Sequence, residues 1–391
     1  MKRIINRIIA VLFAAGLSLN AMGTEIQQDS TRNYIPFMQI KSAGGTVLPT
    51  TPIVRGNKRI PWFNAVSLQY GYASTGRRWQ DGVYGMPYMG VGLHLTDFSR
   101  NKDIGTPITL YLFYGAELKR LSPKLSIGYE GNLGYSFNWK PYDPALNPEN
   151  GAIGARWAVF IAVEPHLRWN INPHLDLQAG VMLSHYSNGG TRKPNNGLNM
   201  FSPTLSLRYK FRQADRQPWS IEKPPLFKKH FEHDISVTAS LRQIMIHSEK
   251  SDVRRPLNYN FDVTGLNYNF CIVPNYNYKY GISAHLVYDA SSHAEIEVDG
   301  DQQSVRLAPF HRRLSLGVAA YGELVAEGFS LFANLGYNVV HNQQDKRFYQ
   351  IIGLKCYLKE NLYGTVGVNA SNLSSAKFLF LSLGYTIRSK R

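Results

Sequence analysis

Cysteine and metal-ligand patterns are almost absent from this 391-residue sequence. Its two cysteines, Cys271 and Cys356, fall in different predicted strands, so we expect neither a disulfide framework nor a cysteine metal site. The histidines show no metal-ligand spacing, and no nucleic-acid-binding module is found. We therefore expect no metal and no nucleic-acid partner. The formal net charge of +16 at pH 7 has two interpretations: lysines and arginines spread over the loops and the interior, or attraction to an anionic surface such as a phosphorylated glycolipid.

Long apolar runs are also lacking, except at the N-terminus. Basic residues between Lys2 and Arg7 precede an apolar run, Ile8–Leu19, and small residues precede Thr24. This pattern is typical of a cleaved secretory signal, and the run is too short for a membrane-spanning helix. We assign residues 1–23 to a signal peptide and expect the remaining chain to be exported.

Aromatic residues and glycine, by contrast, are abundant: 24 Tyr, 19 Phe and 33 Gly. Many segments alternate apolar residues with polar residues or glycine, most clearly Leu125–Phe137. This period of two, over lengths near the ~10 residues of a tilted spanning strand, favours a transmembrane β-barrel. A secreted β-sandwich and a soluble β-helix are the alternatives. Trp139 and Tyr142 stand where an interfacial aromatic girdle is expected.

Together, these segments predict an all-β protein, a transmembrane antiparallel β-barrel of about 14 to 16 strands. A proline-rich, charged stretch at 213–229 reads as a linker or long periplasmic turn. It separates a first half, 24–212, from a second half, 230–391. We favour one wide barrel, and the alternative is two eight-stranded units, because separate closure would equally avoid open edges in lipid.

Loop lengths predict which end of the barrel faces outward. The connections at 118–123 and 171–174 are short, whereas those at 140–151 and after Ser187 are longer. Outer-membrane barrels have short periplasmic turns and longer outer loops. We therefore expect the loop after Ser187 at the outer rim.

The segment Val181–Phe211 reads as a strand, a polar loop and a second strand, and it holds the candidate chemistry. His185 and Ser187 are two residues apart on the first strand, so their side chains leave it on the same side. A hydroxyl becomes an effective nucleophile when a neighbouring base takes its proton. These two residues are therefore a candidate nucleophile and base.

The run HYSN (185–188) followed by KPNNG (193–197) resembles the outer-membrane lipid A 3-O-deacylase (PagL) family. The resemblance covers about residues 60–212 and is sharp over 181–211. It implies a cofactor-free outer-membrane esterase that removes the 3-linked acyl chain of lipid A, with Ser187 as nucleophile and His185 as base. The family has a Glu shortly after its loop, and the matching position here is Asn199. An amide can orient the imidazole but adds no negative charge.

The same resemblance suggests roles for other residues of the loop. Four of them are candidates for supporting the oxyanion: Asn188, Gly189, Gly190 and Asn195. Arg192 and Lys193 could pair with the phosphates or acidic core sugars of lipopolysaccharide. Glu130 and Glu164, on neighbouring strands, are weaker candidates for a carboxylate that replaces the missing Glu. The competing hypotheses are a porin or transporter, and a structural barrel that retains a degenerate deacylase hairpin.

Overall fold

The computed structural model describes residues 33–48, 60–212, 223–248, 251–299, 302–341, 346–372 and 375–389. The expected signal peptide and most of the expected linker lie outside these residues. No helix in the described ranges is long and apolar enough to cross a membrane.

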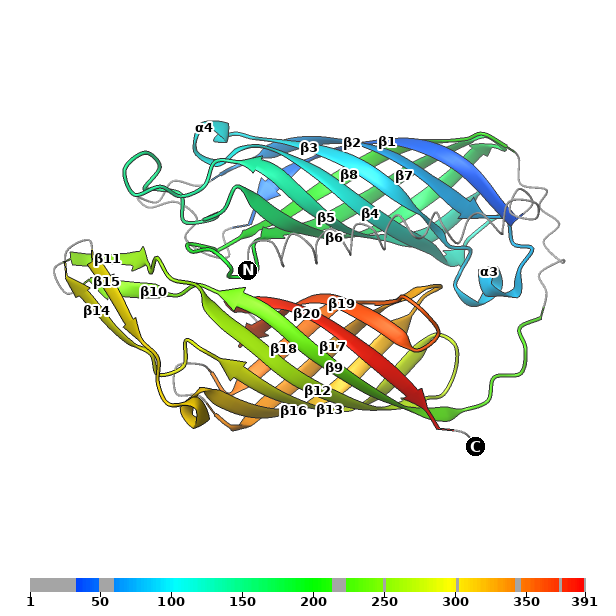
Figure 1. The fold of residues 1–391 in the computed structure, drawn as a ribbon. Helices are drawn as coiled ribbons and strands as arrows, with labels where there is room; N and C mark the ends of the chain where they lie inside the picture. Colours follow the sequence, from blue (N-terminus) through cyan, green and yellow to red (C-terminus); the bar gives the residue numbers. More distant parts are fainter. Residues whose placement is uncertain are drawn as a thin grey trace.

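The first half of the chain folds into a closed antiparallel barrel of eight strands, in which β8 pairs back onto β1 (Figure 1). Its strands are β1 Tyr34–Val47, β2 Phe63–Ser74, β3 Tyr88–Phe98, β4 Gly105–Arg120, β5 Leu125–Trp139, β6 Trp157–Asn172, β7 Leu175–Ser187 and β8 Leu198–Lys210. Two short helices, α3 (Trp79–Val83) and α4 (Asn101–Ile104), lie in its connections.

The second half forms another closed eight-stranded barrel, in which β20 pairs with β9. Its strands are β9 His230–Arg242, β12 Phe261–Val273, β13 Tyr278–Asp289, β16 Leu314–Val325, β17 Phe329–Val340, β18 Phe348–Tyr357, β19 Leu362–Ser371 and β20 Ser375–Arg388. Its connections carry two hairpins and a short 3₁₀ helix, namely β10 Met245–Ser248 with β11 Ser251–Pro256, β14 Glu295–Asp299 with β15 Gln302–Arg306, and η1 Phe310–Arg313.

The predicted all-β, transmembrane barrel architecture is confirmed, and the chain has two eight-stranded units instead of the favoured single wide barrel. In each unit the last strand pairs with the first strand of the same unit. In the first barrel, for example, Ser42 on β1 pairs with Leu205 on β8. Closure pairs the backbone groups of every barrel strand, which is required where the surroundings are hydrocarbon.

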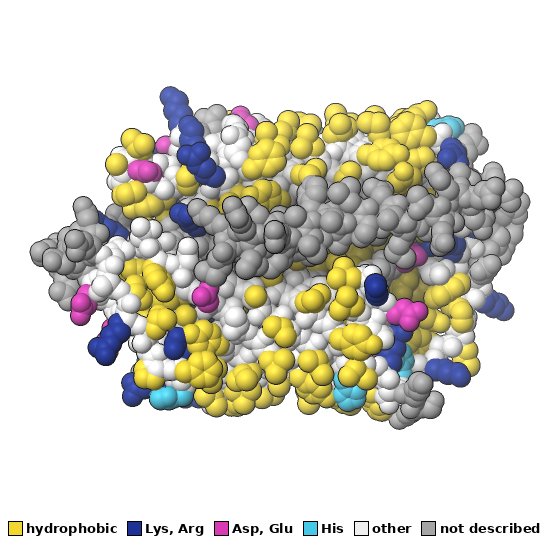
Figure 2. All heavy atoms as spheres, in the orientation of Figure 1, with side chains coloured by type: hydrophobic (Ala, Val, Ile, Leu, Met, Phe, Trp, Pro, Cys, Tyr) yellow, Lys and Arg dark blue, Asp and Glu magenta, His cyan; other side chains and the backbone are white. Residues whose placement is uncertain are grey.

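Side chains alternate between the barrel exterior and its interior as the sequence predicted. On β8, Leu205 and Leu207 are exposed on the outside, whereas Ser206 and Arg208 are buried inside. Hydrophobic side chains are spread over the visible face of both barrels (Figure 2). Trp139 is an exception to the predicted girdle, because it is only 3% exposed and packs against Phe98.

Charged and aromatic side chains fill the interior of the first barrel. Lys41 Nζ lies 2.7 Å from Glu130 Oε1 and also pairs with Glu164, and all three residues are buried. The guanidinium of Arg208 lies over the rings of Phe37 and Tyr88, 4.2 and 4.1 Å from their centroids. Eight strands enclose a space just wide enough for side chains to fill.

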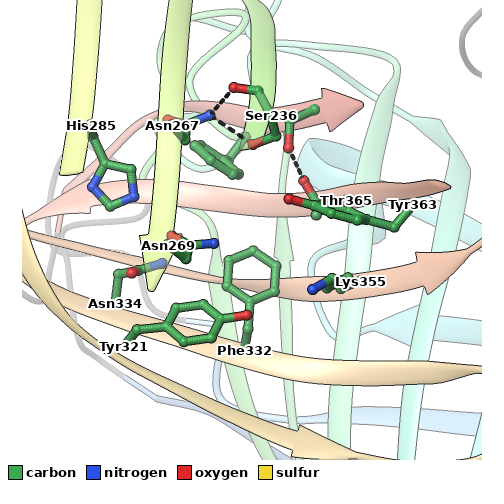
Figure 3. A pocket seen from close by; sticks show the side chains of 12 residues that line it. Ser236, Asn267, Asn269, His285, Tyr321, Phe332, Asn334, Lys355, Tyr363 and Thr365 are labelled. Carbon is green, nitrogen blue, oxygen red and sulfur yellow. Dashed lines mark hydrogen bonds between the residues drawn. The ribbon is translucent and has the colours of Figure 1, made fainter. Parts of the chain in front are cut away.

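The second barrel is filled in the same way. Lys355 pairs with Asp234 at 2.6 Å, and Lys279 pairs with Glu232 at 2.6 Å. Figure 3 shows polar and aromatic side chains, among them Lys355, converging on the barrel interior. The cavities found there have volumes of about 20 and 30 Å³, which is the scale of one or two water molecules.

The two barrels lie side by side with most of their longer connections at the same end (Figure 1). The connection between β2 and β3, which carries α3, lies at the opposite end. At the end with short turns, Arg78 binds Glu327 with an N···O distance of 2.7 Å, and the ring of Trp79 packs on that of Tyr276. At the other end, the loop after Ser187 contacts the second barrel through Gln243. The loop after Ser187 thus lies at the end that carries most of the longer connections, and its position at the outer rim stays a prediction.

Candidate active site

The strand register of β7 and β8 places the candidate residues on the outside of the first barrel. On β7, Met182 and Ser184 face inward and are buried, whereas Leu183 faces outward and is exposed. His185 and Ser187 have the outward parity of Leu183. Asn199 on β8 is the direct cross-strand partner of His185. The predicted nucleophile, base and third residue thus share the exterior face.

His185 is held by a short hydrogen bond to Asn199. Its Nδ1 lies 2.6 Å from Asn199 Oδ1, and because a carbonyl oxygen can only accept, Nδ1 carries the proton. In the neutral ring this leaves Nε2 as an acceptor, which is the form of the imidazole that a general base needs.

Gly197, the last residue of the KPNNG run, makes room for the imidazole. Its φ is +68°, and a Cβ at this position would lie 2.8 Å from His185 Cε1. The motif glycine is therefore required both by its backbone conformation and by the ring beside it.

Two donors fix the oxygen of Ser187. The backbone N–H of Gly189 and the Nδ2 of Asn195 donate to Ser187 Oγ over 3.0 and 2.9 Å. A serine hydroxyl has two acceptor sites and one proton, so both acceptor sites are used and the proton is left to donate. No hydrogen bond joins Ser187 to His185 within the described residues. Ser187 is 6% exposed.

Asn188 and Gly190 shape the loop and do not face the hydroxyl. Asn188 Nδ2 donates to the Arg192 carbonyl over 2.8 Å, and its Oδ1 accepts the Gly190 N–H over 3.0 Å. The Asn188 N–H donates to Asn195 Oδ1 over 3.0 Å. Of the four residues predicted to support the oxyanion, only Gly189 and Asn195 therefore place donors at Ser187.

The two basic residues of the loop differ in their surroundings. Arg192 is exposed, whereas Lys193 is half-buried. Burial, together with the nearby charge of Arg242 from the second barrel, lowers the pKa of Lys193.

Glu130 and Glu164 are not available to His185. Both are fully buried in the interior of the first barrel, where they bind Lys41, and they lie on the opposite side of the barrel wall. Neither can replace the family carboxylate, and the group bonded to His185 Nδ1 is the amide of Asn199. Within the described ranges, no group of three potential ligands could hold a metal ion.

Two family models match the chain. The model "Lipid A 3-O-deacylase (PagL)" matches residues 164–209, and the model "Acyloxyacyl hydrolase, C-terminal domain" matches residues 231–389. Both models support the predicted resemblance to the PagL/acyloxyacyl hydrolase-like family. The resemblance was predicted for about residues 60–212. In the first barrel the match covers residues 164–209, and a second model extends the resemblance to the whole second barrel. The predicted location in the bacterial outer membrane is confirmed.

Solved structures show more distant likenesses. Neisserial surface protein A is 12% identical, with 45% of this chain and 97% of that chain covered and a TM-score of 0.30. The outer membrane enzyme PagL is 15% identical, with 43% and 97% covered and a TM-score of 0.30. The siderophore receptor PirA from Pseudomonas aeruginosa is 11% identical, with 91% and 80% covered and a TM-score of 0.21. No curated protein matches the chain.

Gln243 and Leu379 of the second barrel also touch the loop after Ser187, and sequence reasoning missed both. They are separated from the loop by about 50 and 190 residues and lie in a different closed barrel. The pattern of the PagL-like hairpin carries no signal for them.

Proposed function

We propose that this PagL-like protein is a serine esterase of the outer membrane that removes an ester-linked acyl chain from lipid A. One observation supports this best. On the same exterior face, the Ser187 hydroxyl has both acceptor sites filled and its proton to give, while the Asn199 bond leaves His185 Nε2 ready to take a proton.

The reaction follows from these positions. His185 Nε2 takes the proton of Ser187 as Oγ attacks the ester carbonyl. The Gly189 N–H and Asn195 Nδ2 leave Oγ, which frees a lone pair for the attack, and donate to the oxyanion that forms beside it. His185 then returns the proton to the departing sugar oxygen, which leaves the fatty acyl chain esterified to Ser187. Water, deprotonated by His185, then attacks the acyl carbonyl, and His185 returns the proton to Ser187 Oγ as the acyl–Oγ bond breaks and the fatty acid leaves. A rotation that brings Oγ within ~2.6–3.2 Å of Nε2 on their shared face completes the catalytic geometry.

The surroundings suit an amphiphilic ester. Three apolar residues lie on the exterior close to His185. Their exposed fractions are 44% for Ile161, 48% for Leu183 and 40% for Phe201. An acyl chain in the bilayer can lie along this surface, since it needs no pocket inside the protein. Arg192 and Lys193 follow on the loop side, where a phosphorylated sugar would stand.

Lipid A from cells with and without the protein tests the proposal. Mass spectrometry should show loss of one acyl chain in cells that produce the parent protein, and full acylation with Ser187→Ala. Ser184→Ala is the matched control, because Ser184 is a hydroxyl of the same strand that faces the barrel interior without a hydrogen-bond partner there. Unchanged acylation despite correct insertion of the parent protein would contradict the proposal.

The degenerate-hairpin hypothesis is the second candidate, and one observation favours it. Asn199 supplies no negative charge to stabilise the imidazolium that forms when His185 takes the proton. A parent protein that leaves lipid A intact, but gains activity with Asn199→Glu, would support this hypothesis.

A further inference from the structure

The loop that carries the Ser187 donors, residues 188–195, is bound from outside by the second barrel. Gln243 follows the end of β9 and bonds to this loop at two points. Its backbone N–H donates to the Gly190 carbonyl over 3.1 Å, and its side-chain Oε1 accepts the Lys193 N–H over 2.7 Å. The two bonds fall on successive parts of one tight turn, so they fix both its position and its orientation.

Gln243 is itself held firmly. It is 7% exposed, and its Nε2 donates to the Leu257 carbonyl over 2.6 Å. The amide oxygen and the amide nitrogen therefore each have a suitable partner. If the amide were turned over, its nitrogen would face the Lys193 N–H and its oxygen would face the Leu257 carbonyl, and neither bond could form. The second barrel thus presents a fixed acceptor to the loop.

The barrels also approach so closely here that the loop needs glycine. A Cβ on Gly189 would overlap the side chain of Leu379, which projects from β20. A Cβ on Gly190 would lie 2.8 Å from the Lys377 carbonyl oxygen. Glycine is therefore required at positions 189 and 190 for two reasons. The second barrel leaves no room for a Cβ, and the φ values of +64° and +83° are positive.

We propose that Gln243 is a positioning residue for the Ser187 nucleophile, and that the second barrel completes the active site by holding the loop from outside. The Gly189 N–H and Asn195 Nδ2 that donate to Ser187 Oγ both belong to this loop. Gln243 reaches the reacting atoms only through them. This inference rests on the proposed esterase function for its kinetic consequences, whereas the structural restraint on the loop stands independently of catalysis.

The test compares Gln243→Ala with Gln243→Glu and Gln303→Ala in the full-length protein. Gln243→Glu retains the acceptor for the Lys193 N–H but replaces the donor to the Leu257 carbonyl by an acceptor. Gln303 accepts the backbone N–H of Asn258 over 2.7 Å, so its replacement removes the same kind of bond within the second barrel alone. Acyl release from purified lipid A gives kcat and KM, and amide hydrogen exchange of peptides spanning 188–195 reports the loop directly.

Gln243→Ala should lower kcat by about tenfold or more with little change in KM, because small displacements of reacting groups cost that much. Gln243→Glu keeps one of the two side-chain bonds, so its kcat should lie between those of Gln243→Ala and the parent protein. Gln303→Ala should behave as the parent protein does. Hydrogen exchange of the loop should be faster in Gln243→Ala alone. An unchanged kcat, or a raised KM at constant kcat, would overturn the positioning role.

The exchange measurement separates the two proposals. If the parent protein releases no fatty acid, the esterase function fails, while faster loop exchange in Gln243→Ala still supports the restraint. Unchanged exchange overturns the restraint whether or not the protein is an enzyme. Leu379→Ala provides a second variant should Gln243→Ala not insert: its side chain leaves β20 toward the loop, and its truncation should also speed exchange.

Discussion

At the scale of single residues, the amide of Asn199 determines how strongly the base is supported. It orients the His185 ring through a 2.6 Å bond and leaves Nε2 free to accept, but it contributes no charge when the ring becomes an imidazolium. The site therefore has the tautomer that a triad requires without its electrostatic stabilisation.

Asn199→Glu should consequently raise kcat. A carboxylate in this position would accept the same Nδ1–H and stabilise the imidazolium, and we expect a gain of about tenfold or more, within the ~10⁴ range attributed to such a carboxylate. Asn199→Leu should reduce activity, because the ring loses the bond that sets its tautomer. Rates of fatty acid release from lipid A by the three proteins measure this. A Glu variant no faster than the parent would show that charge at this position is unimportant.

The positions of His185 and Ser187 could be predicted from the sequence, because the period of two in a strand puts both side chains on one face. The roles of the loop residues could not. Asn188 and Asn195 look equivalent in the sequence, yet the first bonds the loop backbone and the second bonds Ser187 Oγ. That difference depends on loop dihedrals, which no periodicity encodes.

At the scale of elements, the hairpin of β7 and β8 acts through its backbone as well as its side chains. Gly197 has a positive φ and borders the His185 ring. The backbone N–H of Gly197 also donates to the Ala152 carbonyl over 3.1 Å. This bond fixes the loop against the connection between β5 and β6. The ring position therefore depends on the loop conformation.

Gly197→Ala tests this dependence. The new methyl group should displace the imidazole and lower kcat by about tenfold or more. Gly328→Ala is the matched control, since Gly328 also has a positive φ, +84°, but nothing lies within 4 Å of a Cβ there. Both variants carry backbone strain, so only the kinetic comparison, made on equally folded protein, isolates the ring contact. Equal losses of activity in the two would contradict it.

The interior of the first barrel gives a prediction about stability. Lys41→Met leaves Glu130 and Glu164 buried without their cation, and we expect the free energy of unfolding to fall by about 3–5 kcal/mol. Lys124→Met, at an exposed turn, should change it by about 0.5 kcal/mol or less. Urea unfolding in lipid vesicles compares the two. Equal stability of both variants would show that the buried cluster contributes little.

At the scale of the whole molecule, the strands were predictable and their closure was not. Alternation predicted about 14 to 16 strands, but it does not say which two strands meet to close a sheet. That choice depends on the pairing of β8 with β1 and of β20 with β9, contacts between residues far apart in the chain. The sequence consequently left one wide barrel and two narrow ones as alternatives.

Two filled, narrow barrels make the porin alternative testable. With lysine–carboxylate clusters inside both barrels and cavities of about 20 and 30 Å³ in the second barrel, small sugars should not pass. Liposomes that contain the protein should therefore show no osmotic swelling in small sugars beyond empty liposomes, in contrast to a porin control. Rapid swelling would require an open pore.

Labelling of Ser187 by a fluorophosphonate tests the central claim most directly, because the probe reacts with a serine that a neighbouring base has activated. Peptide mass spectrometry of the labelled protein should place the adduct on Ser187, strongly reduced by His185→Ala and unaffected by Ser184→Ala. Fatty acid release from lipid A without any adduct at Ser187, or an adduct that forms equally well without His185, would contradict the mechanism proposed here.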